Sequence, residues 1–259
     1  MRTVVAQSSA LVAVAVLGPS LLAGCAADRE AHAATGKPTV AAAMDGKGAV
    51  ATYTFGHSVR GRPLTVTRIG AADAPRRILV VGCIHGNECA GIPILALLAK
   101  RAPAPRTAYY LVPNLNPDGY AAHTRQNAHG VDLNRNFPFR WAANGSAWDT
   151  YYPGPRALSE PESRAALRLI ERIHPTLSVW YHQHMNLVDA AAGAPSSAAR
   201  YARVAHMAVS FLTRYGGSVA TWQQHRWPNR AVLVVELPAR VDSGTQRRHA
   251  DAVRAAGGS

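Results

Sequence analysis

Ile78-Leu-Val-Val-Gly-Cys-Ile-His-Gly-Asn-Glu-Cys-Ala-Gly91 is the stretch around which the rest of this sequence is organised. Its apolar, β-branched start predicts a buried strand, and the glycine after it predicts a turn. His85 and Glu88 stand three residues apart in this turn, so both side chains can point at one position. Neutral imidazole and carboxylate are both good zinc ligands, and a catalytic zinc takes three protein ligands and a water. An H-x-x-E pair is common by chance, so the metal hypothesis depends on the remainder of the chain.

The first residues have the pattern of a secretory signal peptide. Arg2 supplies a positive start, residues 11–17 form an apolar core, and small residues precede Cys25. Leu22-Ala-Gly-Cys25 also resembles the lipobox of bacterial lipoproteins, in which cleavage precedes a cysteine that becomes lipidated. We therefore expect a lipoprotein signal peptide at 1–24, membrane attachment through lipid on Cys25, and an extracytoplasmic location. The alternatives are an ordinary cleaved signal, which would leave a secreted protein, and an uncleaved anchor.

Composition divides the rest of the chain into a tether and one domain. Residues 25–48 are rich in Ala, Gly and short polar residues, which predicts a flexible tether. Residues 49–259 suit a single catalytic α/β domain, since 48% of the chain is hydrophobic, which is ample for a core. The formal net charge of +13 favours anionic surroundings, although scattered arginines can also simply solvate a surface. No Lys/Arg run with interleaved aromatics occurs, so we expect no nucleic-acid partner, and no protein partner is implied.

Strand and helix patterns alternate along the predicted domain. Predicted strands lie at 64–69, 78–84, 109–112, 177–181 and 231–235, and predicted helices at 90–100, 159–173 and 244–256. Pro113-Asn-Leu-Asn-Pro-Asp-Gly119 is dense in turn-forming residues and is predicted to be a loop. The alternation is typical of α/β folds with a central mixed, twisted β-sheet flanked by helices, and with functional residues at the strand ends.

Two of the predicted strands deliver residues that could carry chemistry. His182 ends an apolar strand, where it can face a site, and His184 would share its face if the strand continued. Glu236 is the single acid in Leu233-Val-Val-Glu-Leu-Pro238. A carboxylate in so apolar a strand is costly to desolvate unless it has a use or a partner. It is therefore interpreted as functional, the alternative being a salt bridge at the strand end.

The strongest single motif is Thr124-Arg-Gln-Asn-Ala-His-Gly-Val-Asp-Leu-Asn-Arg-Asn-Phe-Pro138. Together with His85-x-x-Glu88, Ser159-Glu-Pro-Glu162 and Val234-Val-Glu-Leu-Pro238, it resembles the M14 zinc carboxypeptidase family. The matches follow the family's order over about residues 50–240. The short spacing from Arg125 to Asn134-Arg135 is similar to that of the bacterial murein peptide amidase branch, whereas digestive carboxypeptidases carry a longer insert there.

The resemblance implies a ligand set and roles for the other residues. It implies that His85, Glu88 and His182 bind one Zn²⁺ per chain, a His₂Glu set of the kind known in carboxypeptidase A. His184 is then expected to line the cleft. Glu236 is implied as the general base. Arg125 is implied to stabilise the oxyanion, and Asn134 and Arg135 to bind a substrate carboxylate; loop-stabilising hydrogen bonds are the alternative for these three, and Asp132 is expected to make such bonds.

Three features are not fixed by the resemblance. The family usually has a tyrosine over the substrate, but Tyr215 stands too close to Trp222 for a clean alignment, so no tyrosine is assigned. The specificity pocket is expected at Val219-Ala-Thr-Trp222, which holds no acid and so argues against a preference for Lys or Arg side chains. Cys83 and Cys89 flank the His-Glu pair as either a disulfide or buried thiols, and the thiols are favoured.

The sequence therefore predicts a zinc-dependent carboxypeptidase or amidase that hydrolyses an amide bond near the carboxyl end of peptides. The favoured substrates are cell-wall stem peptides, cut between D-glutamate and the diamino acid. The first alternative is a general extracytoplasmic carboxypeptidase that acts on protein or peptide C-termini. The remote alternative is a lipid-anchored binding protein with an inactive site, which the intact His85, Glu88, His182 and Glu236 oppose.

Overall fold

The computed structural model describes residues 41–43, 50–190, 195–212 and 215–258. All of them belong to one compact unit, Pro38–Ser259. The predicted signal peptide and Cys25 lie outside the described residues. The predicted tether also lies outside them, apart from Ala41–Ala43, which pair as a strand beside the domain and so differ from the prediction. Among the helices that are described, none is both long and apolar enough to cross a bilayer.

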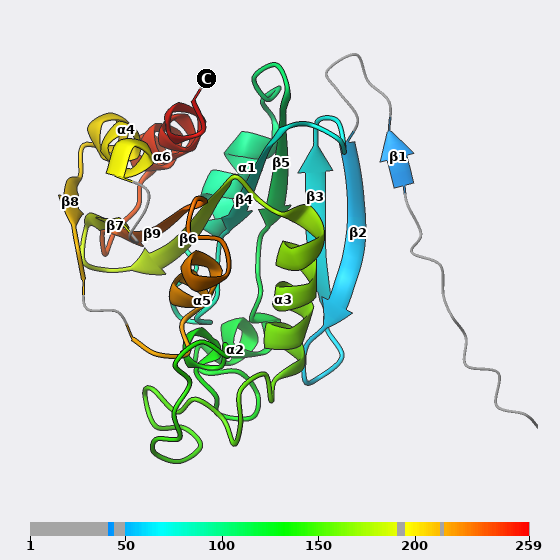
Figure 1. Ribbon diagram of the computed structural model, residues 1–259, viewed down its shortest axis with the longest axis vertical. Coiled ribbons are helices and arrows are strands. Elements are labelled where there is room, and N and C mark those ends of the chain that lie inside the picture. The colour runs from blue at the N-terminus through cyan, green and yellow to red at the C-terminus, as the bar shows by residue number, and fades with distance from the viewer. Residues whose placement is uncertain (1–40, 44–49, 191–194, 213–214, 259) are drawn as a thin grey trace, which may run out of the picture. The chain divides into compact units, whose positions relative to one another are not determined.

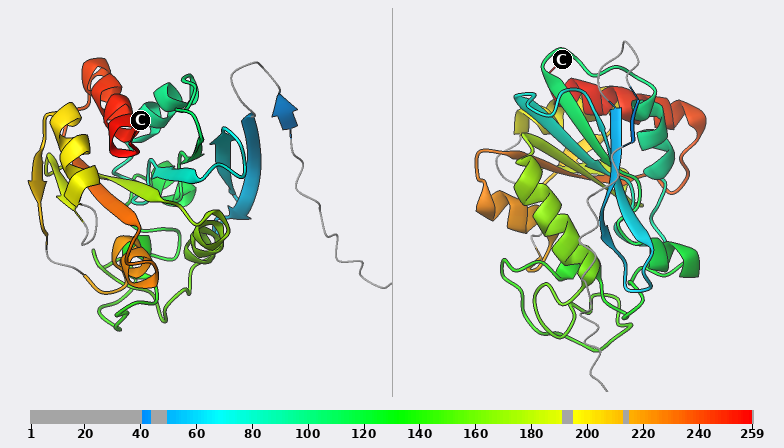
Figure 2. Two further views of the ribbon diagram at one scale, coloured as in Figure 1. Left: turned by 45° about the horizontal axis from the view of Figure 1, so that its top comes forward. Right: turned by 90° about the vertical axis from the view of Figure 1, so that its right-hand side faces the viewer.

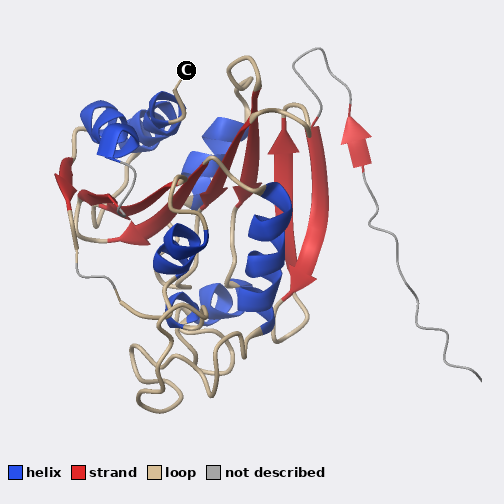
Figure 3. Ribbon diagram, viewed as in Figure 1, coloured by secondary structure: helices blue, strands red, loops and turns tan. Residues whose placement is uncertain are grey.

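A mixed sheet runs through the described part of the domain (Figures 1 and 3). Its nine strands are β1 (Ala41–Ala43), β2 (Val50–His57), β3 (Pro63–Ile69), β4 (Arg76–Val81), β5 (Thr107–Val112), β6 (Leu177–Gln183), β7 (Leu187–Ala190), β8 (Ala208–Ser210) and β9 (Ala231–Leu237), in the order β1-β2-β3-β5-β4-β6-β9-β7-β8. The central strands β5, β4, β6 and β9 are parallel, whereas β1, β2, β3 and β7 pair with their inner neighbours in antiparallel fashion. The predicted α/β class with a mixed sheet is what the chain adopts.

Helices cover both faces of this sheet (Figure 2). They are α1 (Ile92–Ala99), α2 (Pro117–Ala122), α3 (Pro161–Ile173), α4 (Pro195–Ala205), α5 (Val219–Arg226) and α6 (Ser243–Ala256), with a 3₁₀ turn at Leu133–Arg135. Buried side chains of α1, α4 and α6 share one apolar core with one face of the sheet. Those of α3 and α5 share a second core with the other face. The alternation of side chains along each strand separates the two cores.

The alternation also decides which way the candidate residues point. On β6, Val179 and Tyr181 belong to the core under α1, α4 and α6, whereas Trp180 belongs to the core under α3 and α5. His182 follows the parity of Trp180 and so lies on the α3–α5 side. In the parallel β6–β9 pair, His182 lies opposite Glu236. The sheet therefore brings these two residues together at its carboxyl edge.

The predicted loop at 113–119 contains the start of a helix. Helix α2 begins at Pro117, and the Asn116 side chain accepts a hydrogen bond of 2.9 Å from the backbone N–H of Gly119. Asn and Pro are turn formers, but they are also favoured residues at the cap and first position of a helix. The prediction was therefore wrong for Pro117–Gly119, because the same residues fit both structures.

A buried polar chain crosses the core under α4 and α6. The hydroxyls of Tyr181 and Tyr201 are 3.0 Å apart, and the Tyr201 hydroxyl lies 2.7 Å from Nδ1 of His249. All three side chains are almost fully buried. Burial, and to a lesser extent the charge of Arg248, lowers the pKa of His249 to about 4. The imidazole is therefore neutral in the folded protein at neutral pH.

We expect this histidine to make folding sensitive to acid. Its pKa is lower in the folded chain than the ordinary value of about 6.5, so its contribution is complete above pH 6.5 and is lost as the pH falls towards 4. The loss in the free energy of unfolding should be roughly 3 kcal/mol over that window. His249→Gln keeps an acceptor for Tyr201 but does not titrate, so its unfolding free energy should change less. Urea unfolding at pH 7 and pH 4.5 measures the free energy of unfolding of the wild-type protein and of the His249→Gln variant. An equal dependence on pH in these two proteins would contradict the expectation.

Candidate active site and metal centre

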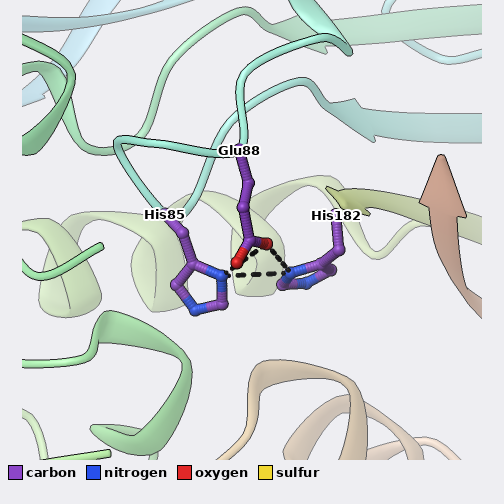
Figure 4. Close-up of side chains that lie close together, drawn as sticks. All are labelled: His85, Glu88 and His182. Carbon is purple, nitrogen blue, oxygen red and sulfur yellow. Dashed lines mark hydrogen bonds and ion pairs between the residues drawn. The ribbon is translucent and has the colours of Figure 1, made fainter. Parts of the chain in front are cut away.

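Three side chains from two separate segments converge at the carboxyl edge of the sheet (Figure 4). Nδ1 of His85 lies 2.9 Å from Oε2 of Glu88. Nδ1 of His182 lies 3.2 Å from each of those two atoms. Ligand atoms about 2.1 Å from a tetrahedral zinc are about 3.4 Å apart, so the three atoms have nearly the spacing that the ion requires. Two imidazole nitrogens and one carboxylate oxygen are also a donor set that zinc prefers.

The turn after β4 carries two of these side chains. Gly86 has no space for a side chain, because a Cβ there would collide with the backbone of Gly119 and Tyr120 in α2. The backbone N–H of Glu88 donates to the carbonyl of His85 at 3.0 Å, which closes the turn. The start of α2 and this turn are thus packed backbone to backbone, and that packing fixes where His85 and Glu88 point.

A disulfide joins Cys83 to Cys89. The interpretation of these residues as buried thiols is therefore wrong. The turn folds back until the two Cα atoms are 4.6 Å apart, which is within the range that a disulfide spans. Sequence spacing alone did not reveal this approach, because it depends on the conformation of the whole turn. The bond encloses both His85 and Glu88 in one short covalent ring.

Asp132 contacts the ring nitrogen of His85 that lies away from the donor group. Its Oδ1 lies 3.0 Å from Nε2 of His85 and accepts a hydrogen bond of 2.9 Å from the backbone N–H of Asn134. Its Oδ2 accepts one of 3.1 Å from Nε of Arg125. A carboxylate on the far nitrogen of a metal-binding histidine fixes its tautomer and ring orientation. Asp132 thus makes the expected loop bonds and, in addition, orients His85, a role that the sequence reasoning missed.

The two carboxylates at this position stay ionised despite their burial. Burial would raise the pKa of Glu88, yet hydrogen bonds and charge from His182 and His85 hold the pKa of this carboxyl far below its usual range. Burial would likewise raise the pKa of Asp132, and the nearby His85 and Arg125 outweigh it, so this pKa is also low. Burial lowers the pKa of His182, which favours its neutral, ligating form. For His85, burial would lower the pKa, but Asp132 reverses the effect and raises it.

Two arginines lie beside the donor group. Nη1 of Arg125 donates to Oε1 of Glu88 at 2.7 Å, so its guanidinium lies next to the candidate metal position. Nη1 of Arg135 donates to the carbonyl of Asn134 at 2.8 Å. The Asn134 side-chain oxygen accepts a hydrogen bond of 3.1 Å from Val219 N–H at the start of α5. Burial lowers the pKa of Arg135, but a guanidinium remains charged at neutral pH.

Glu236 completes the group from β9. Its Oε2 is buried, and no hydrogen-bond partner for it is found among the described residues. Buried polar atoms in proteins are generally paired, so this unpaired carboxylate oxygen requires an explanation, and a role in the cleft that Glu236 lines supplies one. The strand-end salt bridge, which was the alternative role for Glu236, is absent from the described part of the chain.

One cleft of about 390 Å³ contains all seven candidate residues, His85, Glu88, Arg125, Asn134, Arg135, His182 and Glu236. His184 also lines it, as expected. The lining includes residues that the sequence reasoning did not assign: Tyr151, Gln183, Asp189 and Tyr215. Residues 219–222 do lack an acid, but Asp189 of β7 gives the cleft one. The argument against basic side chains in the substrate therefore stays a prediction.

The family model described as zinc carboxypeptidase, Peptidase_M14, matches residues 40–224. The chain belongs to the M14 zinc carboxypeptidase family. The family resemblance and the hydrolytic activity that it implies are thus confirmed, and zinc is the metal that the family implies. The matched region ends before Glu236, so this residue joins the M14 site through the register of β6 and β9.

Several individual proteins of known type are similar to this chain. The chain is 30% identical over 213 residues to murein peptide amidase A of Vibrio campbellii, covering 77% of this chain and 84% of the relative. It is 31% identical over 149 residues to murein peptide amidase A of Escherichia coli K12, covering 53% and 61%. The crystal structure of murein-tripeptide amidase MpaA from E. coli O157 superposes with a TM-score of 0.65 at 25% identity, covering 78% and 89%. That of carboxypeptidase A from Helicoverpa armigera superposes with a TM-score of 0.68 at 21% identity, covering 80% and 68%, and confirms the fold.

Proposed function

We propose that this M14 protein hydrolyses an amide bond near the carboxyl end of cell-wall stem peptides, between D-glutamate and the diamino acid. The observation that carries the hydrolysis is the convergence in one cleft of a His₂Glu donor set, an unpaired Glu236 carboxylate oxygen and the Arg135 guanidinium. The choice of substrate is supported by the murein peptide amidases among the relatives. One zinc per chain is proposed, held by His85, Glu88 and His182.

The proposed chemistry divides among the residues of the cleft. His85, Glu88 and His182 would hold a zinc ion, which would supply Lewis acidity to polarise the scissile carbonyl and to acidify water. Glu236 takes a proton from the attacking water as the new C–O bond forms, and delivers it to the leaving nitrogen as the C–N bond breaks. Arg125, beside Glu88, stabilises the negative charge that develops on the carbonyl oxygen. Asn134 and Arg135 bind the substrate carboxylate, for which a guanidinium fork is suited.

The charges of the cleft fit a diamino acid as the leaving part. Arg125 and Arg135 supply positive charge for carboxylates, and Asp189 supplies negative charge from β7. A diamino acid with free carboxylates carries both signs of charge, as the lining of the cleft does. A general extracytoplasmic carboxypeptidase remains the second candidate, because carboxypeptidases also superpose on the fold. An inactive binding protein is disfavoured by the complete set of candidate residues in the cleft.

Purified protein with zinc should release the diamino-acid-containing fragment from muropeptides faster than it trims acyl-dipeptides.

Arg135→Ala should raise KM by roughly tenfold or more for substrates with a free carboxylate, because a charge-assisted hydrogen-bonded pair is lost. The same substrates with the carboxylate converted to an amide should show no such increase. Arg168→Ala, an exposed arginine of α3, is the matched control. If the wild-type protein left muropeptides uncut but trimmed ordinary L-peptides, the result would favour the general carboxypeptidase instead.

We also propose that the protein is a lipoprotein of the cell membrane, on the basis of Leu22-Ala-Gly-Cys25 after an apolar run. Mass spectrometry of the membrane fraction should find a mature N-terminus at Cys25 that carries a diacylglyceryl group. A Cys25→Ser variant should lose the modification. An unlipidated N-terminus downstream of Cys25 in the membrane fraction would refute the proposal.

A further inference from the structure

Tyr151 belongs to a long loop that lies between the 3₁₀ turn and α3 (Figures 1 and 3). The backbone on both sides of it is fixed. The side-chain amide of Gln126 donates to the carbonyls of Trp148 and Asp149, at 3.2 and 3.0 Å. The carbonyl of Tyr152 accepts a hydrogen bond of 2.8 Å from Asp132 N–H. The loop therefore presents Tyr151 at a defined place in the cleft lining, anchored to the same Asp132 that orients His85.

The ring of Tyr151 contacts both arginines of the site. The guanidinium carbon of Arg125 lies 5.4 Å from the ring centroid, and that of Arg135 lies 5.1 Å from it. Both distances are within the reach of a cation–π interaction. Tyr215 adds a second ring, parallel to the first with centroids 6.4 Å apart, and the Arg135 guanidinium carbon lies 4.5 Å from its centroid. Arg135 is thus in contact with two aromatic faces.

These contacts leave the hydrogen-bonding edge of Arg135 available. A guanidinium stacks through its face, whereas its N–H groups donate in its plane. Within the described part of the chain, Arg135 forms no salt bridge with an acid, and its Nη1 donates a hydrogen bond to the Asn134 carbonyl. Arg125, in contrast, is held by Glu88 and Asp132. Among the described residues, the tyrosine rings therefore contribute to the orientation of Arg135 together with that hydrogen bond.

We propose that Tyr151 is a positioning residue, whose aromatic face orients Arg135 for binding of a substrate carboxylate. The inference deepens the proposed function and rests on it. The face of the ring is the part that acts, since no hydrogen bond of the Tyr151 hydroxyl is found among the described residues. The ring is about half exposed, at 53%, so replacing it leaves the two apolar cores intact.

Tyr151→Phe and Tyr151→Leu separate the ring from the hydroxyl. For a substrate with a free carboxylate, the Leu variant should raise KM by about threefold to thirtyfold with little change in kcat, which is the range of a cation–π contact. The Phe variant should behave like the wild-type protein. The amide form of the same substrate should be affected by neither variant. Tyr120→Leu, an exposed tyrosine of α2 outside the cleft, is the matched control.

A double-mutant cycle with Arg135→Ala tests the mechanism. If Tyr151 acts through Arg135, the Leu substitution should have almost no further effect on KM in the Arg135→Ala background. Equal effects in both backgrounds, or a Phe variant as impaired as the Leu variant, would overturn the proposal. A loss of stability in urea unfolding without a change in KM would also overturn it, since it would indicate a merely structural role.

A binding measurement makes the test independent of which amide is cut. Zinc-free protein is titrated with N-acetylglycine and with N-acetylglycinamide, and binding is followed by NMR chemical shifts. The carboxylate should bind more weakly to the Leu variant than to the wild-type and Phe proteins, while the amide should not discriminate among them. If the carboxylate bound equally well to the wild-type, Phe and Leu proteins, the proposed role of Tyr151 would be refuted. If the protein failed to cut muropeptides, only the proposed substrate would be refuted.

Discussion

Glu236→Gln is expected to keep its zinc and to lose at least about a hundredfold in kcat. The substitution preserves the volume of the side chain, and Glu236 is not one of the three clustered donor residues, so metal content should not change. What it removes is the carboxylate oxygen that is buried without a partner in the cleft. An amide accepts no proton from water at neutral pH, so the proposed transfer to the leaving nitrogen is lost.

The measurement pairs zinc analysis with single-turnover kinetics on one substrate. Glu171→Gln, at an exposed position of α3, is the control for loss of one negative charge, and should turn over normally. If Glu236→Gln were to retain wild-type kcat, the base would have to be another group. If it lost zinc, the assignment of the ligands would have to be revised.

His182→Ala should remove zinc, whereas His184→Ala should not. Nδ1 of His182 lies 3.2 Å from the other two donor atoms, while His184 lines the cleft without belonging to the donor group. Loss of one of three ligands should weaken zinc binding by more than the roughly 10- to 100-fold that loss of a supporting second-layer partner costs.

Elemental analysis after gel filtration measures the zinc content of the two variants. Each is a matched control for the other, because the substitution is the same and the positions are two residues apart. Activity of the wild-type protein should disappear with a chelator and return with added zinc. Stoichiometric zinc retained in a His85→Ala, His182→Ala double variant would contradict the assigned centre. If the His184→Ala variant lost zinc and the His182→Ala variant kept it, His184 would be the ligand and His182 the residue that only lines the cleft.

The parts of the site that could be predicted from the sequence are those carried by strand ends. His85, His182 and Glu236 each follow or end an apolar run, and the carboxyl ends of parallel strands meet at one edge of a sheet. The pattern therefore indicated both the sheet and the convergence. The motif around Arg125 and Arg135 added the residues of the connecting segment through the family resemblance.

The parts that could not be predicted depend on how irregular segments fold. Tyr151 lies in a loop with no periodicity, and its place is fixed by hydrogen bonds from Gln126 and Asp132 that no local pattern reveals. Asp189 comes from β7, a strand of only four residues that gives little signal of its own. The Cys83–Cys89 pairing likewise required the path of the turn.

The register of β6 against β9 ties the survival of the active site to the survival of the fold. Side chains alternate along a strand, so a one-residue deletion within β9 would turn Glu236 towards the core of α1, α4 and α6 and bring an apolar neighbour to the cleft. Such a chain would bury a carboxylate among aliphatic side chains, which is strongly destabilising. Insertions and deletions in this strand should therefore be eliminated as misfolded protein before any folded but inactive enzyme accumulates. The loop that carries Tyr151 belongs to no strand, so a change in its length shifts no strand register and buries no carboxylate in the core.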